Sequence, residues 1–288
     1  MMTDDSLELA TAAWESIGTP ARILAALRAQ GIRGLAEAEA SLDDEGRARA
    51  RRNAADLRER GMGVLIYGEV GYPSALAGQK APPPLIFYKG ELSILEFSAV
   101  GMCGSRAASE VGLRAARACG NAVAQEGLTI VSGYARGVDT ETHLAALRSD
   151  GRTVIVLAEG ILHFKVKKAF VEDFDDRRAL VLSQFPPRQP WSAGAAMTRN
   201  AVIAGLGRAL IVIEAHEKGG TIDAGLQALA MGRPVLALEF ETGPTPEGNA
   251  RLIEKGAIAV RRPAQLRAVI AALKDPASSG DQLSLTLL

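Results

Sequence analysis

The sequence TIVSGYARGVD, residues 129–139, indicates the fold of this chain more clearly than any other stretch. Residues 129–132 form a short, mostly apolar run that leads directly into a turn with two glycines and an arginine, and a helix-forming segment follows. An apolar run of this kind is typical of a strand that is covered on both faces, as in parallel sheets with crossover helices. The stretch therefore predicts one strand–loop–helix unit of an α/β sheet.

Similar units recur through most of the 288 residues. The predicted strands are residues 64–67, 85–88, 98–102, 129–132, 153–157, 179–183, 209–214 and 235–238. The predicted helices between and after them are residues 109–126, 139–150, 197–205, 221–231 and 263–273. This alternation predicts an α/β fold with an extended Rossmann-like, mostly parallel, doubly wound sheet.

The chain divides by composition into three parts. Residues 1–62 contain no strand-like run and have apolar residues at helix-like intervals, which predicts a small N-terminal helical domain. We interpret that domain as a packing module, with a helix-hairpin-helix-like nucleic-acid module as the alternative. Residues 63–275 are predicted to form the Rossmann-like domain, and residues 276–288 a flexible tail.

Charge and cysteine content limit the function classes. Lys plus Arg and Asp plus Glu both number 33, so the formal net charge is zero, which argues against a polybasic DNA binder but not against a local basic groove. Cys103 and Cys119 have neither metal-ligand nor CxxC spacing, so we expect buried thiols in a reducing compartment. Because the chain has no long apolar segment and no secretory signal, we expect a cytoplasmic protein without membrane contact. No metal or cofactor is expected.

Residues that suit phosphate binding follow three of the predicted strands, where open α/β sheets bind their ligands. After the strand at 98–102 come Gly104, Ser105 and Arg106, and then a helix whose N-cap is Ser105 or Ser109. Glycine lets the backbone approach an anion, the helix start offers free N–H groups, and arginine adds a forked cation. A surface arginine without such a role is the alternative.

A second loop of this kind follows the strand at 129–132. Its candidate phosphate-binding residues are Ser132, Gly133, Arg136 and Gly137. Asp139 is suited to be the N-cap of the next helix, and His143 follows it by one turn. Both are interpreted as supporting residues, and for His143 a structural hydrogen bond to Asp139 or a nearby carbonyl is favoured over catalysis.

A third loop follows the strand at 209–214. Here Gly219, Gly220 and Thr221 offer backbone amides, the helix dipole and a hydroxyl to an anion, although Thr221 alone would also serve as a plain N-cap. Several such loops on one sheet edge indicate a common anion-binding face. Two further candidates, Arg199 and Asn200, lie at the start of another predicted helix. Lys165 and Lys168 belong to a basic segment, for which a solvated helix face is the alternative.

Other short motifs accompany the three loops in a fixed order. They are Tyr72-Pro73-Ser74-Ala75-Leu76, Pro83-Pro84-Leu85 with Lys89-Gly90, Ile203-Ala204-Gly205-Leu206 after Arg199-Asn200, Glu214-Ala215, and Gly248-Asn249 with Leu252-Ile253. In their order and spacing, these motifs and the three loops resemble the DprA/Smf family of DNA-processing proteins. The resemblance extends from about Tyr72 to about Ala257.

The resemblance implies an extended Rossmann fold that forms a homodimer and binds single-stranded DNA. It implies a binding protein and not an enzyme, one that assists a RecA-type recombinase in recombination or natural transformation. It implies electrostatic, salt-dependent phosphate contacts. These contacts would come from Arg106, Arg199 and the lysines at 165–168, helped by the amides of Gly104, Gly133, Gly219 and Gly220. The chain departs from the family pattern at residues 162–165, at Ala201, where a second basic residue is usual, and at Gly219, where a serine is usual. Too few residues follow 257 for the winged-helix domain of many relatives.

Two other functions stay open. A nucleotide-sensing module needs few cations and therefore suits the zero net charge. A phosphoribohydrolase-like enzyme would use Arg199, but Ala224 stands where its glutamate is needed, which leaves Asp223 as the neighbouring carboxylate. A nicotinamide-dependent oxidoreductase is disfavoured because no Gly-x-Gly-x-x-Gly follows a strand. The candidates for base stacking are Tyr134, Phe164 and Phe185. For Phe164 and Phe185, packing under their loops is the alternative, and it is favoured for Phe185.

Overall fold

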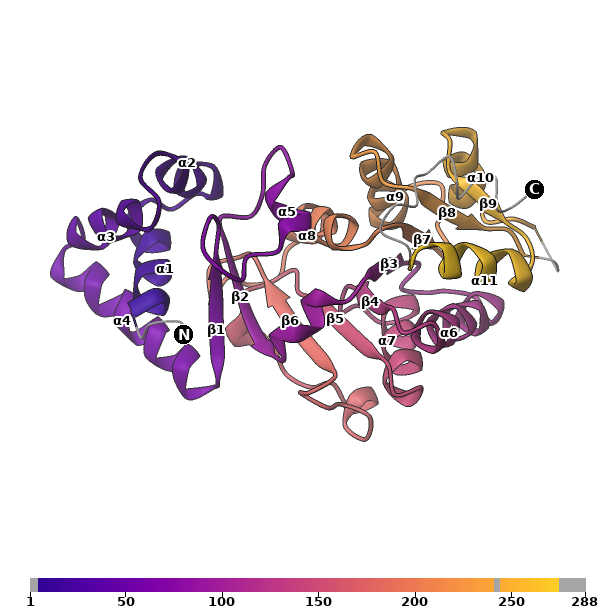
Figure 1. Cartoon of the computed structure of the whole chain (residues 1–288), viewed down its shortest axis with the longest axis horizontal. Coiled ribbons are helices and arrows are strands. Elements are labelled where there is room, and N and C mark those ends of the chain that lie inside the picture. The colour runs from indigo at the N-terminus through magenta and orange to yellow at the C-terminus, as the bar shows by residue number, and fades with distance from the viewer. Residues whose placement is uncertain (1–4, 241–243, 275–288) are drawn as a thin grey trace. The chain divides into compact units, whose positions relative to one another are not determined.

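The computed structural model describes residues 5–240 and 244–274 (Figure 1). The predicted tail at 276–288 lies outside these residues. The chain forms two compact units: the first contains the residues up to Gly90, Leu157–Lys165 and Val181–Ala195, and the second contains Glu91–Val156, Val166–Leu180 and the residues from Ala196 onward. The units do not follow the boundary at residue 62, so the division into a helical and a Rossmann-like domain stays a prediction.

The first unit begins with the helices α1 (Asp5–Ser16), α2 (Pro20–Gln30), α3 (Ile32–Ala40) and α4 (Asp44–Glu59), which confirms the helical prediction. Gly31, with φ 61°, separates α2 from α3. The Asp43 carboxylate caps α4 by accepting from Gly46 N at 2.7 Å. Helices α1 and α4 are joined by the Thr11 hydroxyl, which donates to Ala50 O at 3.0 Å.

An antiparallel pair of strands completes the regular structure of the first unit. β1 (Met62–Ile66) pairs with β2 (Leu85–Gly90), with Met62 opposite Lys89. The connection between them contains the short helix α5 (Ser74–Ala77), and the 3₁₀ turn η2 (Ile161–His163) follows later in the chain. Both β1 and β2 were predicted as strands, with bounds that differ by at most two residues.

The second unit is built on the strands β3 (Ala99–Cys103), β4 (Thr129–Ser132), β5 (Arg152–Val156), β7 (Leu210–Val212), β8 (Val235–Leu238) and β9 (Ile258–Val260). They lie in the order β5-β4-β3-β7-β8-β9, and each neighbouring pair is parallel. The strand order therefore reverses between β3 and β7, as in a doubly wound sheet, and this switch point is where such sheets bind ligands. β6 (Ala179–Ser183) begins in this unit and continues into the first.

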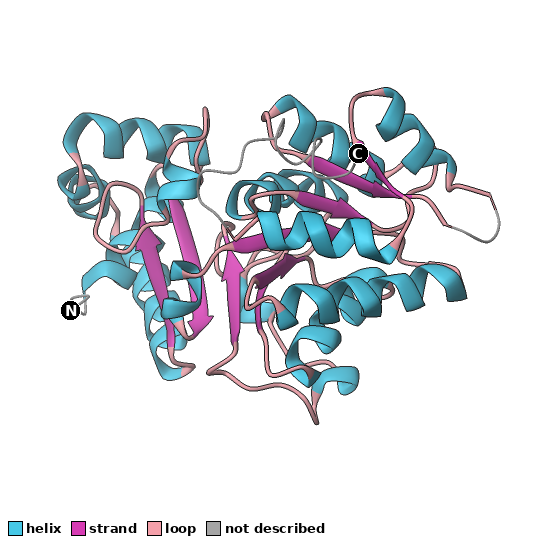
Figure 2. Cartoon of the chain, turned by 45° about the vertical axis from the view of Figure 1, so that its right-hand side comes forward, coloured by secondary structure: helices cyan, strands magenta, loops and turns pink. Residues whose placement is uncertain are grey.

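Helices cover both faces of these strands, which confirms the α/β, Rossmann-like prediction. The helices are α6 (Glu110–Gln125), α7 (Val138–Arg148), α8 (Ala193–Leu206), α9 (Gly220–Ala230), α10 (Glu247–Glu254) and α11 (Pro263–Ala272), with 3₁₀ turns η1 (Leu92–Glu96) and η3 (Lys168–Phe170). Helices α6 and α11 lie on one side of β7–β9, and α9 and α10 lie on the other (Figures 1 and 2). The core between α6, α7, α11 and the strands includes Val100, Ile130, Ile211, Val123, Ala146 and Val269.

One strand and one α-helix of the second unit were not predicted, nor were its 3₁₀ turns. β9 is only three residues long, and α10 follows a segment rich in proline and glycine, so neither gave a clear pattern. The prediction of buried thiols is confirmed, because Cys103 and Cys119 are buried and unpaired. Within the described residues, no helix is long and apolar enough to cross a membrane.

Candidate functional site

The loops after β3, β4 and β7 gather at one edge of the second unit, because these strands are parallel neighbours. Ser132 at the end of β4 donates from Oγ to Met102 O at 2.7 Å. Val138 N donates to Ser105 O at 3.3 Å, and Ser105 N donates to Glu214 O at 2.8 Å. The loop after β3 is therefore hydrogen-bonded to both neighbours, and the three predicted loops form one continuous edge.

The loop after β3 contains one buried and one exposed candidate. Ser105 is buried, accepts from Ala107 N at 3.1 Å and lies 3.2 Å from His216 Nε2 in the loop after β7. Arg106 is exposed. Of the two predicted N-caps, Ser109 is the correct one, since its Oγ accepts from Gly112 N at 3.0 Å. Ser105 thus fixes the loop, and Arg106 is the exposed cation of this loop.

Glu214, which sequence reasoning did not select as a site residue, occupies the start of α6. Its carboxylate accepts from Ser109 N at 3.0 and 3.2 Å and from Ser109 Oγ at 2.6 Å. A Cβ at Gly112 would overlap Glu214 Oε2, so the glycine leaves room for the carboxylate. Since Glu214 is only 8% exposed, an internal anion fills the helix start that was expected to receive a phosphate.

The loop after β4 packs tightly around Gly133. A Cβ at this position would overlap Arg199 Nη1 and Asp139 Oδ2, so only glycine fits between the two charged side chains. Arg199, on α8, is 8% exposed and donates from Nη1 to Val156 O at 3.2 Å. Its Nε is buried and has no hydrogen-bond partner among the described residues. The structure thus places Arg199 beneath the loop, and its predicted phosphate contact stays a prediction.

Asp139 and Arg199 each affect the pKa of the other in the buried part of this edge. Burial raises the pKa of the Asp139 carboxyl, while Arg199, Ala135 N and Ser132 act in the opposite direction. Burial also lowers the pKa of the Arg199 guanidinium, and Asp139 opposes that shift. Each charge is therefore held in the interior by the other, as buried charges require.

The helix α7 starts earlier than the sequence suggested. Its N-cap is Gly137, with φ 77°, and not Asp139, so the predicted N-cap is wrong. Glycine can adopt this left-handed backbone, which brings the chain against the carbonyl of Ser105, where a Cβ would clash. Asp139 is the second helical residue and accepts from Ala135 N at 3.2 Å.

His143 has the structural role that was favoured for it. Its Nε2 donates to Gly133 O at 2.6 Å, and its Nδ1 accepts from the Thr153 hydroxyl at 2.6 Å. Burial lowers the pKa of His143 to about 4, so the imidazole is neutral at pH 7. The ring therefore holds the Gly133 loop and is not placed to exchange protons with solvent.

The start of α9, after β7, is open to solvent. Gly219, with φ 121°, is the N-cap, so Thr221 is inside the helix and is not its cap. Gly219 and Gly220 are exposed, and a Cβ at either would meet no described atom within 4 Å. Asn200 on α8 supports this turn by donating to Gly220 O at 3.4 Å. The exposed amides and the helix dipole suit an anion.

The basic segment divides between the two units. Lys165 belongs to the first unit, and Lys168 is exposed in η3 of the second. Lys167, which lies among the lysines at 165–168, contacts Tyr134: its Nζ lies 3.9 Å from the ring centroid and donates to Tyr134 O. The Tyr134 ring also lies 5.4 Å from that of Phe170. Lys167 therefore packs against the loop after β4.

The stacking candidates are less exposed than base stacking requires. Phe164 and Phe185 are each 8% exposed, which confirms the packing interpretation for Phe185 and favours it for Phe164. Tyr134 is half-buried, with Lys167 over its ring. Among the described residues, no group of three His, Cys, Asp or Glu side chains is placed to hold a metal ion. The exposed cations of the three loops are Arg106, Arg136 and Lys218.

The fold and the edge define a class of protein: a Rossmann-like sheet with exposed arginines and an open helix start next to its switch point. Residues 63–271 match the family model described as DNA recombination-mediator protein A. The chain therefore belongs to this DNA-processing family, and the three loops all lie inside the matched segment.

Individual relatives agree with this assignment. The chain is 36% identical to the DNA processing protein DprA of Streptococcus pneumoniae over 188 residues, and this alignment covers 65% of this chain and 66% of the relative. It is 30% identical over 209 residues to DprA of Bacillus subtilis, covering 72% and 70% of the two chains. The match to the Smf protein of Escherichia coli, at 34% identity, covers 68% of this chain and 53% of that protein.

Solved structures show the same fold. The X-ray structure of DprA from Streptococcus pneumoniae superposes with a TM-score of 0.69 at 28% identity, covering 90% of this chain and 95% of that chain. A structure described as giving insight into the unique single-stranded DNA binding mode of DNA processing protein A from Helicobacter pylori has a TM-score of 0.62 at 23% identity, covering 72% and 94%. The second likeness concerns the fold alone.

Proposed function

We propose that this chain binds single-stranded DNA through the phosphate backbone, at the carboxyl edge of the second unit's sheet. The observation that carries the proposal is the open start of α9 beside a switch point, in the segment that matches a DNA-processing family. The relative from Helicobacter pylori is described as binding single-stranded DNA. Together these findings support a strand as the ligand.

The exposed groups of the edge suit phosphates more than bases. The amides of Gly219 and Gly220 and the dipole of α9 would receive one phosphate, while Arg106 and Arg136 would neutralise neighbouring ones. Because such contacts do not read base edges, binding is expected to tolerate many sequences and to weaken with salt. Arg199 packs against Gly133 from the interior.

The proposal is one of binding without catalysis. The glutamate of a phosphoribohydrolase is replaced by Ala224, which is buried, and the neighbouring Asp223 is exposed on α9. A homodimer, a RecA-type recombinase as partner and a role in recombination or transformation are further parts of the proposal, and they rest on the family resemblance. A cytoplasmic location is proposed as well, in keeping with the two buried, free thiols.

A free nucleotide is the second candidate ligand. The formal net charge is zero, and Arg199 is buried, which leaves Arg106 and Arg136 as exposed arginines of the three described loops. With Lys218 the loops offer three exposed cations, which suffice for one nucleotide, whereas a strand needs a longer track. Competition between the two ligands therefore decides between the candidates.

Fluorescence anisotropy of a labelled oligo-dT strand tests the proposal. We expect binding that weakens as salt is raised from low to moderate concentration and that free nucleotides do not displace. The absence of strand binding at low salt, together with a thermal shift on adding a nucleotide, would overturn the proposal in favour of nucleotide sensing.

A further inference from the structure

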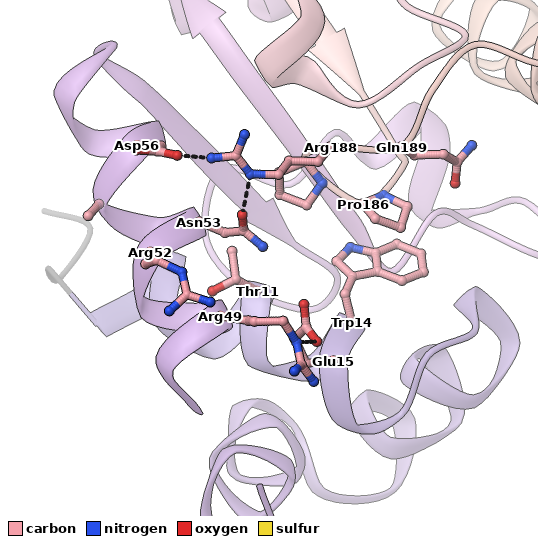
Figure 3. Close-up of a pocket in the computed structure, with 12 residues that line it drawn as sticks. Thr11, Trp14, Glu15, Arg49, Arg52, Asn53, Asp56, Pro186, Arg188 and Gln189 are labelled. Carbon is pink, nitrogen blue, oxygen red and sulfur yellow. Dashed lines mark hydrogen bonds and ion pairs between the residues drawn. The ribbon is translucent and has the colours of Figure 1, made fainter. Parts of the chain in front are cut away.

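A cavity of about 590 Å³ lies wholly within the first unit (Figure 3). Its walls come from α1, α4 and the loop at 186–189. The volume is in the range of small-molecule sites, which is about 300–1,000 Å³. No residue of this cavity belongs to the three loops proposed to bind the strand, so the two sites are independent of each other.

The charges of the cavity leave one arginine uncompensated. Arg49 is paired with Glu15 at 3.0 Å and also bonds Glu45, and Arg188 is paired with Asp56. Arg52 is exposed and has no ion-pair partner among the described residues. An anion that enters the cavity would therefore meet Arg52 without displacing an existing pair.

The cavity also has a flat apolar wall. The partly buried indole of Trp14 lies beside the ring of Pro186, across from Asn53 (Figure 3). The indole Nε1 is buried and has no hydrogen-bond partner among the described residues. A buried donor without an acceptor is uncommon in proteins, so this wall lacks one oxygen or nitrogen that a ligand or a water would supply after a small movement of the ring.

We propose that this cavity binds a nucleotide unit, with its base against Trp14 and Pro186 and its phosphate on Arg52. An aromatic face and an uncompensated cation in one cavity form the combination that recognises a base together with its phosphate. Of the arginine-rich run RARARR at residues 47–52 of α4, Arg49 and Arg52 line the cavity. The nucleotide is either free or part of a single strand, because both present the same chemistry.

Trp14 itself can report the binding. The chain has two tryptophans, and Trp191 is 50% exposed, so Trp191→Phe leaves Trp14 as the only indole at little risk to the fold. In this background, dTMP and oligo-dT are titrated separately while the Trp14 fluorescence is followed. We expect saturable quenching, and Arg52→Gln should raise the Kd by about fivefold. The matched control Arg51→Gln changes the neighbouring exposed arginine outside the cavity and should leave the Kd unchanged.

Each outcome decides for or against the nucleotide site. Quenching by both probes, or by oligo-dT alone, supports it, and the second result assigns the nucleotide to a strand. No saturable quenching by either probe overturns it, as does an equal loss in Arg51→Gln, which would indicate general attraction to α4. Arg106→Ala should leave the Trp14 signal intact, so a failure of the proposed strand site is seen separately. Loss of the signal in Arg106→Ala would also overturn the second site.

Discussion

The loops after β3 and β7 lie next to each other at the switch point, yet the helices that follow them begin in different environments. At α6, the carboxylate of Glu214 already accepts from Ser109 N and Oγ. At α9, Gly219 and Gly220 are exposed, and Asn200 supports the turn from behind. The difference teaches that a glycine-rich junction between strand and helix exposes its amides to solvent only where no side chain of the chain itself occupies the helix start.

The largest effect is expected at the closed part of the edge. In Gly133→Ala, the new methyl group overlaps Arg199 and Asp139, whose positions are fixed by burial. We expect the free energy of unfolding to fall by about 3 kcal/mol, measured by urea denaturation. A loss below about 0.5 kcal/mol would show that the loop adjusts freely, and the closed edge would then not differ from the open one.

A smaller loss is expected when the internal anion is removed. Glu214→Ala leaves Ser109 N and Oγ without their acceptor, so we expect a loss of about 2–3 kcal/mol in urea. The exposed Glu217, in the same loop, provides the control Glu217→Ala, which should cost less than about 0.5 kcal/mol. In addition, inorganic phosphate should stabilise Glu214→Ala more than the native protein, because the start of α6 becomes available. Equal responses of all three proteins would contradict the comparison.

The support of the Gly133 loop should also appear in the pH dependence of stability. Burial lowers the pKa of His143 to about 4, whereas the unfolded chain takes up this proton below about pH 6.5. The unfolded state then binds more protons, so the free energy of unfolding falls as the pH falls, by about 2 kcal/mol at about pH 5. Urea unfolding at neutral pH and at about pH 5 should show a larger loss in the native protein than in His143→Gln.

Asp139 does not obscure this result. Burial raises the pKa of its carboxyl, so its contribution has the opposite sign and stabilises the folded state as the pH falls. That contribution is common to the native protein and to His143→Gln, and the difference between them isolates the imidazole. If both lose the same stability, His143 does not hold the loop as described.

The smallest effect on stability is expected at the open helix start. A Cβ at Gly220 meets no described atom within 4 Å, so Gly220→Ala should change the free energy of unfolding by less than about 0.5 kcal/mol. The same methyl group would stand where a phosphate approaches the amides, so the affinity for oligo-dT should fall although the fold is intact. Unchanged affinity would remove α9 from the proposed interface.

The sequence predicted the alternation of strands and helices because the buried strands are short apolar runs. It also gave Ser109 as one of two possible caps of α6, with Ser105 as the other, and Ser109 is the cap. It misplaced the starts of α7 and α9, because Gly137 and Gly219 adopt positive φ values and begin these helices before Asp139 and Thr221. Local caps are thus predictable where a serine has no competing glycine.

The parts of the site that depend on tertiary pairing were not accessible from the sequence. Glu214 reaches Ser109 over 105 residues of chain, and only the adjacency of β3 and β7 brings them together. The burial of Arg199 depends in the same way on the packing of α8 against the loop after β4. Residue type indicated an arginine site, whereas the fold decided whether the arginine faces solvent or supports the loop.

The most direct test of the account is the salt dependence of oligo-dT binding in Arg106→Ala, with Arg114→Ala as the control. Arg114 is an exposed arginine on α6, beyond the loop that follows β3. If Arg106 contacts a phosphate, its removal should weaken binding and reduce the slope of log K against log salt by about 0.7, whereas Arg114→Ala should leave the slope unchanged. An unchanged slope in Arg106→Ala would contradict the claim that this edge binds the DNA backbone.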